Sequence, residues 1–343
     1  MISIIIPNYN NERLVGKCIR SILNQTYTDV EIIAVDDDSS DNSLQVLRKY
    51  EAEDKRVRVI ALEKNGGVEK ARLAGIKEAK GDFICFVDSD DYLPKKAIEL
   101  LFKKQNATDA DVVEGGFARV FDPFGIIKKF TPPTEQIICQ PELFDKYFIS
   151  FFGVNILNVS LCGKLYRRNL FSDFEAIKPL GLGMGEDLML NMRIFPNIKK
   201  YAIISDCVYY YRWGGITSGF NRHLYPSIKA EYYIKLKTIE RYDYKKALRF
   251  TKIEMCNVFN TQMEQLVGYN KTLNEIQKFF NDEVESGFVD QITDGITCRG
   301  GYFPYLKQHD FNGYIDYLKC EKHKKRKKSL LIRLLRIIFK VIS

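Results

Sequence analysis

The chain lacks the short motifs that mark several common enzyme classes. No GxGxxG follows an apolar run and GxxxxGK[ST] is absent, which argues against a dinucleotide-binding domain and a P-loop. Histidine is scarce, with only His223, His309 and His323 in no HExxH pattern, and GxSxG is missing as well. Catalysis by this chain would therefore rest on carboxylates and a metal ion.

Signals for disulfides and for membrane spans are absent too. The 8 cysteines include no CxxC pair, and most lie among apolar residues, as Cys85 does in FICFV, where a free cysteine behaves as a small buried hydrophobe. No window reaches the roughly 20 apolar residues of a membrane span. The first residues, MISIIIPNYN, contain no basic leader. We therefore expect the protein in a reducing cytoplasm.

Acidic residues are missing from the last 22 positions, which hold nine lysines and arginines. Removing these nine from the 52 basic residues leaves 43, against 44 acidic ones, so the net charge of +8 describes the tail and the body is close to neutral. A nearly neutral body argues against a nucleic-acid groove. The tail, HKKRKKSLLIRLLRIIFKVIS, joins a basic cluster to an amphipathic segment, which predicts a helix lying on an anionic membrane surface. A helix packed on the protein or on a partner is the alternative.

Apolar runs alternate with amphipathic segments through the first 105 residues. Runs at 2–6, 31–35, 56–62 and 83–87 are each followed by a helical pattern, which predicts a parallel sheet with helices on both faces. Farther along, the sequence predicts a strand at 111–121, a proline-containing loop at 122–141, one or two strands at 201–213 and mostly helix from 225 to 320. Open parallel sheets bind ligands beyond the carboxyl ends of their strands. The residues that follow each strand are therefore the candidate site.

Polar and acidic residues follow the four predicted strands. The fourth strand runs into Asp88, Asp90 and Asp91, and carboxylates at i and i+2 could share a divalent cation with a substrate's phosphates. An Asp-rich turn that caps the next helix is the simpler alternative. Arg72 follows a Gly-Gly pair at the start of a predicted helix, where it could bind a diphosphate or lie on the surface. Glu186 and Asp187 could supply a general base or only a helix cap.

Taken in order, these motifs resemble those of the family 2 glycosyltransferases, inverting enzymes with the GT-A fold. The resemblance covers about 220 residues and rests on IIIPNYN, SILNQTY, VDDDSSDNS, NGGVEKARLAG, GDFICFVDSDDYLP, KLYRRNLF, GED and YYYRWGGITS. It implies a Rossmann-like, mostly parallel α/β sheet with helices on both faces. We expect this domain at 1–220, a mainly helical region at 221–320 and the membrane-associating tail at 321–343.

The resemblance also implies roles for single residues. A nucleotide-sugar donor, expected to be a UDP-sugar, would have its base and ribose pocket lined by Pro7, Tyr9 and Asp37, with Arg72 nearby. Asp88 and Asp90 match the family's DxD, with Asp90 the better ligand for Mn²⁺ or Mg²⁺, and Asp91 would shape the sugar site. Asp187 matches the catalytic base that deprotonates an acceptor hydroxyl, and Glu186 is the substitute.

Two positions depart from the family pattern. Asp38 stands where DDGS has glycine, so the turn could differ in charge or shape. Cys162 and Gly163 replace an aromatic residue and an asparagine before KLY, which puts the acceptor side in question.

The sequence thus predicts a cytoplasmic, membrane-peripheral, metal-dependent glycosyltransferase that extends a glycan or a lipid-linked oligosaccharide of the cell surface. Two alternatives stay open. One is a sugar-phosphate nucleotidyltransferase, although PNYNNERL is not the basic glycine-rich loop that would favour it. The other is a non-catalytic, membrane-docked protein that binds nucleotide sugars.

Overall fold

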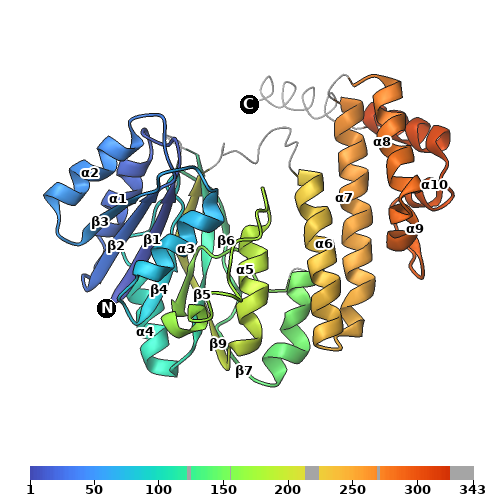
Figure 1. Cartoon of the computed structure of the whole chain (residues 1–343). Coiled ribbons are helices and arrows are strands. Elements are labelled where there is room, and N and C mark those ends of the chain that lie inside the picture. Colours follow the sequence, from blue (N-terminus) through green and yellow to red (C-terminus); the bar gives the residue numbers. More distant parts are fainter. Residues whose placement is uncertain (122–124, 155, 213–223, 269–270, 325–343) are drawn as a thin grey trace, which may run out of the picture. The chain divides into compact units, whose positions relative to one another are not determined.

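The computed structural model describes residues 1–121, 125–154, 156–212, 224–268 and 271–324. The chain divides into two compact units, Met1–His223 and Leu224–Ser343. The predicted tail helix lies outside the described residues from 325 onward, as does the GGITS part of the last family motif (Figure 1).

Four strand-helix pairs open the first unit, as the alternation predicted. They are β1 (Ile2–Asn8), α1 (Val15–Leu23), β2 (Val30–Asp36), α2 (Ser43–Glu53), β3 (Val57–Ala61), α3 (Val68–Glu78), β4 (Phe83–Phe86) and α4 (Ala97–Thr108). The strands are parallel in the order β3-β2-β1-β4. All seven residues of β1 are buried, which is typical of a strand covered on both faces.

The sheet then continues with strands of mixed direction. These are β5 (Val112–Phe121), β6 (Gly125–Phe130), β7 (Gln136–Cys139), β8 (Lys164–Arg167) and β9 (Lys200–Arg212). The path through the sheet is β3-β2-β1-β4-β8-β5-β9-β7, and β6 pairs with the outer part of β5. Short helices and α5 (Glu186–Ile194) connect these strands; the short ones are η1 (Leu143–Tyr147), η2 (Phe148–Phe152), η3 (Arg168–Phe171) and η4 (Phe195–Asn197).

The predicted loop at 122–141 was wrong over the parts that form β6 and β7. The sequence of β6, GIIKKF, shows no alternation because nearly all of its side chains are exposed, and its strand form comes from pairing with β5. The segment expected to hold one or two strands near 201–213 is a single long strand, β9.

Helices cover both faces of the sheet, as predicted. Phe83 and Phe86 lie three positions apart in β4 and so point to opposite faces. Phe83 contacts Phe102 of α4, whereas Phe86 packs beside Ile5 on the face that α3 covers. A Cβ on Gly75 of α3 would lie 2.4 Å from Cγ2 of Ile5, so glycine permits this close approach.

The carboxyl ends of β1, β2 and β4 meet at one edge of the sheet. The chain leaves β1 toward β2 on one side and later returns to place β4 on the other side. A reversal of this kind creates the crevice in which open α/β sheets bind ligands. The segments after β1, β2, β3 and β4 are thereby gathered at one place.

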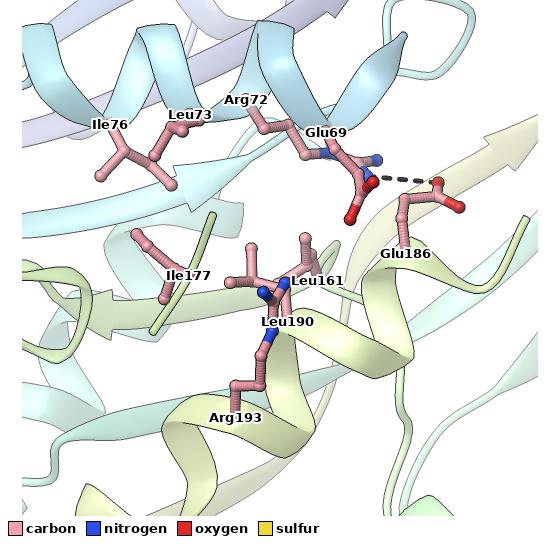
Figure 2. A pocket seen from close by; sticks show the side chains of 9 residues that line it. All are labelled: Glu69, Arg72, Leu73, Ile76, Leu161, Ile177, Glu186, Leu190 and Arg193. Atoms are coloured by element: carbon pink, nitrogen blue, oxygen red, sulfur yellow. Dashed lines mark hydrogen bonds and ion pairs between the residues drawn. The ribbon is translucent and has the colours of Figure 1, made fainter. Parts of the chain in front are cut away.

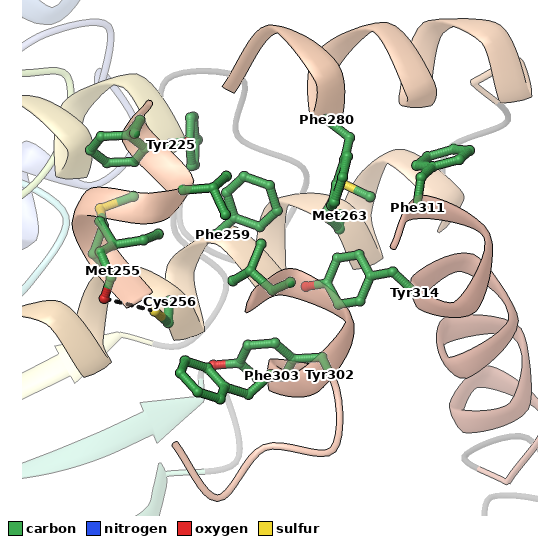
Figure 3. Close-up of a cluster of buried hydrophobic side chains, with 14 of the residues drawn as sticks. Tyr225, Met255, Cys256, Phe259, Met263, Phe280, Tyr302, Phe303, Phe311 and Tyr314 are labelled. Carbon is green, nitrogen blue, oxygen red and sulfur yellow. Dashed lines mark hydrogen bonds between the residues drawn. The ribbon is translucent and has the colours of Figure 1, made fainter. Parts of the chain in front are cut away.

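The second unit is helical, as predicted for 225–320. It contains α6 (Leu224–Arg241), η6 (Lys245–Ala247), α7 (Leu248–Gly268), α8 (Leu273–Glu285), α9 (Phe288–Thr293), α10 (Phe303–Lys307) and a further helical segment at 311–324. Its core is rich in aromatic side chains, among them Phe259, Phe280 and Tyr314 (Figure 3). Within the described residues, no helix combines the length and the apolar character that a membrane crossing requires.

Candidate active site

Arg72 is the centre of the candidate site. Its side chain, from the second turn of α3, is only 4% exposed and donates hydrogen bonds to three carboxylates. Its Nη2 lies 2.9 Å from Oδ1 of Asp88, and its Nη1 lies 2.5 Å from Oδ1 of Asp187 and 3.3 Å from Oε1 of Glu186. Figure 2 shows the bond to Glu186. One guanidinium therefore joins the DSDD segment after β4 to the GED segment at the start of α5.

The charges around Arg72 set its protonation and that of Glu186. Burial lowers the pKa of Arg72, but Asp187 and Asp88 outweigh this effect and hold the pKa well above its usual value. Burial and the adjacent Asp187 raise the pKa of Glu186. Arg72 is thus permanently charged, and it stabilises the carboxylates of Asp88, Glu186 and Asp187 in a site that is partly shielded from water.

Asp187 is held from a second direction by the segment before β8. Its Oδ2 accepts hydrogen bonds from Oγ of Ser160 and from the backbone N–H of Leu161, both at 3.0 Å. Lys164 fastens this segment, because its buried ammonium donates to the carbonyl oxygens of Asn158 and Ser160. The Asp187 carboxylate therefore has partners on both oxygens and a defined orientation.

Lys164 has an acidic partner in the core of the sheet. Its Nζ lies 3.7 Å from Oε2 of Glu114 on β5, which in turn accepts a hydrogen bond from Tyr201. Burial lowers the pKa of Lys164, against the opposing effect of Glu114. Sequence reasoning did not identify Ser160 or Lys164. Lys164 stands in the KLYRRNLF motif and could have been considered, whereas nothing in the sequence distinguishes Ser160.

The acidic segment after β4 is held by β9. Asp91 is 1% exposed; its Oδ2 accepts from the Tyr209 hydroxyl and its Oδ1 from the Arg212 N–H, both at 2.7 Å. Burial, followed by the charges of Asp90 and Asp88, raises the pKa of Asp91 to about 8. Burial and Asp88 also raise the pKa of Asp90. Tyr209 and Arg212 lie in the YYYRWGGITS motif, but no role was predicted for either of them.

Asp88 and Asp90 stay the candidate cation ligands that the sequence predicts. Across the residues that the structure describes, no group of three or more His, Cys, Asp or Glu side chains is arranged around one point as a metal cage. Mg²⁺ does not require such a cage, because it commonly takes one or two carboxylates and completes its shell with water and substrate phosphates. Two hard carboxylate ligands at i and i+2 suit such an ion, and burial and the charge of Asp88 raise the pKa of Asp90.

The residues expected at the base and ribose lie at the ends of β1 and β2. Pro7 is buried in β1 opposite Val35, and Tyr9, just past the strand, is 51% exposed. Asp37 is 3% exposed, and its two oxygens accept hydrogen bonds from the N–H groups of Gly66 and Gly67, each at 2.8 Å. The Asp37 side chain therefore fastens the loop after β3 to the end of β2 and shapes this side of the expected base and ribose pocket.

Asp38, the first departure from the family pattern, has φ +60°, in the left-handed region that glycine adopts readily. This backbone conformation explains why glycine is usual at the position, and aspartate is among the few residues that tolerate it. The second departure consists of Cys162, which is buried, and Gly163, which has φ +74° just before β8. Positions 38 and 163 both need unusual backbone geometry, and both are occupied by residues that can supply it.

The family of the chain follows from its similarity to known proteins. The sequence model of glycosyl transferase family 2 matches residues 3–174, and the chain belongs to that family. It is similar to the uncharacterized glycosyltransferase EpsJ of Bacillus subtilis, with 32% identity over 215 residues, which are 62% of this chain and 61% of that protein. It is also similar to the glycosyltransferase GlyG of Streptococcus pneumoniae, with 43% identity over 143 residues, which are 42% of this chain and 47% of that protein. The matched part thus spans less than two thirds of these relatives.

A solved structure shares the fold over most of the chain. Residues 1–349 of TarS from Staphylococcus aureus, in complex with UDP-GlcNAc, match with a TM-score of 0.68 at 21% identity, covering 94% of this chain and 92% of that one. This likeness confirms the predicted GT-A architecture and the helical region that follows it.

Proposed function

We propose that the protein transfers a sugar from a nucleotide-sugar donor to a hydroxyl group of a glycan or of a lipid-linked oligosaccharide, with inversion at the anomeric carbon. The observation that carries this proposal is the Arg72 network. Arg72 binds Asp88, the first residue of the DSDD segment, through Nη2 and Asp187, the expected base, through Nη1. Membership of glycosyl transferase family 2 supports the same reaction class.

Asp187 serves as the general base in this proposal. Its carboxylate takes the proton of the acceptor hydroxyl, whose oxygen attacks the anomeric carbon while the bond to the leaving diphosphate breaks. Arg72, Ser160 and the Leu161 N–H hold the carboxylate in one orientation. A fixed orientation lowers the entropic cost of aligning the base with the acceptor hydroxyl. Glu186 lies beside the same guanidinium and is the substitute base.

Donor binding is assigned to the crevice at the ends of β1, β2 and β4. Pro7, Tyr9 and Asp37 form the wall for the base and ribose, and Asp91 shapes the sugar end. Mn²⁺ or Mg²⁺, held by Asp90 and Asp88 when bound, would neutralise the charge of the departing diphosphate. A UDP-sugar is the expected donor, since TarS, which shares the fold, was solved with UDP-GlcNAc.

The test is a donor panel in the presence and absence of Mn²⁺. We expect one nucleoside-diphosphate sugar to raise the melting temperature, because a ligand that binds only the folded state stabilises it. Asp187→Asn should keep this shift and lose transfer to the acceptor, Asp90→Asn should lose the metal-dependent part of the shift, and Asp206→Asn, an exposed change on β9, should alter neither. A chain that binds no nucleoside-diphosphate sugar would refute the proposal, and tight binding without turnover would favour the non-catalytic alternative.

We further propose that the protein works in the cytoplasm and is held at an anionic membrane surface by its basic tail. The support is compositional: nine basic residues and no acidic ones among apolar side chains at 322–343. Flotation with vesicles that contain anionic lipid should recover the full chain and not a chain that ends at Cys320. Equal recovery of the two chains would remove the tail from the proposal.

A further inference from the structure

The loop that delivers the expected base has no regular secondary structure of its own. Residues 178–185, KPLGLGMG, precede α5, whose first two residues are Glu186 and Asp187. Gly181 and Gly185 have φ values of +72° and +82°. Gly185 occupies the N-cap position of α5, so this helix has no side chain that caps its first N–H groups. Glycine-rich segments lose much conformational entropy when they are ordered, so a particular contact must hold this loop in place.

That contact comes from Glu69 on α3. Its Oε2 accepts hydrogen bonds from three successive backbone N–H groups, those of Leu180 at 2.9 Å, Gly181 at 2.8 Å and Leu182 at 3.2 Å. Successive N–H groups that converge on one point form a binding place for an anion, and hydrogen bonds to an ionised acceptor are the stronger kind. Here the anion belongs to the chain itself, so the loop closes around a carboxylate supplied by α3.

Glu69 lies one helical turn before Arg72, on the same face of α3. Figure 2 shows both side chains leaving this helix beside Glu186, Leu190 and Arg193 of α5. Arg193 pins the other end of the loop, because its Nη1 donates to the Lys178 carbonyl oxygen at 2.6 Å. Helix α3 therefore holds the GED segment in two ways: Arg72 binds its carboxylates, and Glu69 binds the loop that leads to them.

We infer that Glu69 is a positioning residue, which sets the place of the Asp187 carboxylate by ordering residues 180–182. This inference rests on the proposed function, in which Asp187 is the base. Because the hydrogen bonds that the Glu69 carboxylate accepts from the described residues come from the loop, its loss should leave the donor pocket intact and misplace the base. A displaced base lowers the rate of the chemical step, by about 10- to 100-fold for a misplacement of about 1 Å.

The test compares Glu69→Ala and Glu69→Gln with Glu53→Gln, which removes an exposed carboxylate from the end of α2. The first measurement is hydrogen exchange of the free protein. In Glu69→Ala the amides of 180–182 should exchange faster, together with the first turn of α5, while β1 and β4 keep their protection. Glu69→Gln keeps one acceptor oxygen and should fall between wild type and Glu69→Ala, and Glu53→Gln should match wild type.

The second measurement separates kcat from donor affinity. Glu69→Ala should lower kcat and leave the donor Kd unchanged, with partial rescue in Glu69→Gln. Unchanged exchange at 180–182 in Glu69→Ala would overturn the inference, and so would faster exchange with wild-type kcat. The exchange experiment needs no substrate. A chain that shows the exchange effect and transfers no sugar from any donor therefore refutes the proposed function and leaves the anchoring of the loop by Glu69 established.

Discussion

Replacement of Arg72 by methionine provides the sharpest test of the charge network. The change keeps a long apolar stem in α3 and leaves Asp88, Glu186 and Asp187 facing one another without their cation. Loss of one partner from a buried ion pair costs about 3 to 5 kcal/mol. The three carboxylates stay 20 to 33% exposed, so water screens part of their repulsion, and we expect a loss of about 2 to 4 kcal/mol.

The loss should depend on pH with a definite sign. Without the guanidinium, the folded-state pKa of Glu186, which burial and Asp187 already raise, rises further above its unfolded value. The folded state then binds more protons than the unfolded state, so stability falls as the pH rises. The deficit of Arg72→Met relative to wild type should therefore be larger at pH 8 than at pH 5.

Urea unfolding at the two pH values measures both effects. With a slope of about 3 kcal/mol per molar urea, the expected loss moves the midpoint by about 1 M. Arg48→Met is the matched control, because Arg48 pairs with Glu51 on α2 at 50% exposure and should cost less than about 1 kcal/mol. Equal midpoints for Arg72→Met and wild type at pH 8, or a deficit that is the same at both pH values, would refute the network as described.

Three further changes test other parts of the fold and site. Asp38→Gly should stay within about 1 kcal/mol of wild type, whereas Asp38→Val, which forces a β-branched residue to φ +60°, should lose about 2 kcal/mol by thermal or urea unfolding. In wild type, the raised pKa of Asp91, about 8, means that stability is lost as the pH rises from about 4 to 8, and Asp91→Asn should flatten this slope. Lys164→Met strands the buried Glu114 and should cost about 3 kcal/mol, and the second change Glu114→Gln should recover part of that loss.

The sequence predicted the first half of the sheet well because each of its strands is an apolar run bounded by turns and followed by an amphipathic helix. It failed at β6, whose exposed Ile126 and Lys128 carry no periodic signal and depend on β5 for their conformation. Tertiary pairing of this kind cannot be seen in a local window.

The candidate site divides in the same way. Asp88, Arg72 and Asp187 belong to motifs that the sequence displays, so their types could be predicted, and the structure shows that one guanidinium joins them. Glu69 accepts a hydrogen bond from the backbone N–H of Leu180, which is 111 positions away in the sequence. Ser160 donates to the side chain of Asp187, which is 27 positions away. No pattern within one segment of the chain marks such long-range partners, because the contact exists only once the sheet has formed.

The order of strands also has a consequence for how the protein folds. Strands β1 to β4 follow one another along the chain and can pair once residue 86 is available, whereas β5 lies between β8 and β9, which begin at residues 164 and 200. Contacts between residues so far apart in sequence form slowly. We therefore expect the half of the sheet that forms the proposed donor crevice to assemble before the half that precedes the proposed base. A chain emerging from the ribosome would then form the proposed donor crevice before Asp187, the proposed base, is in place.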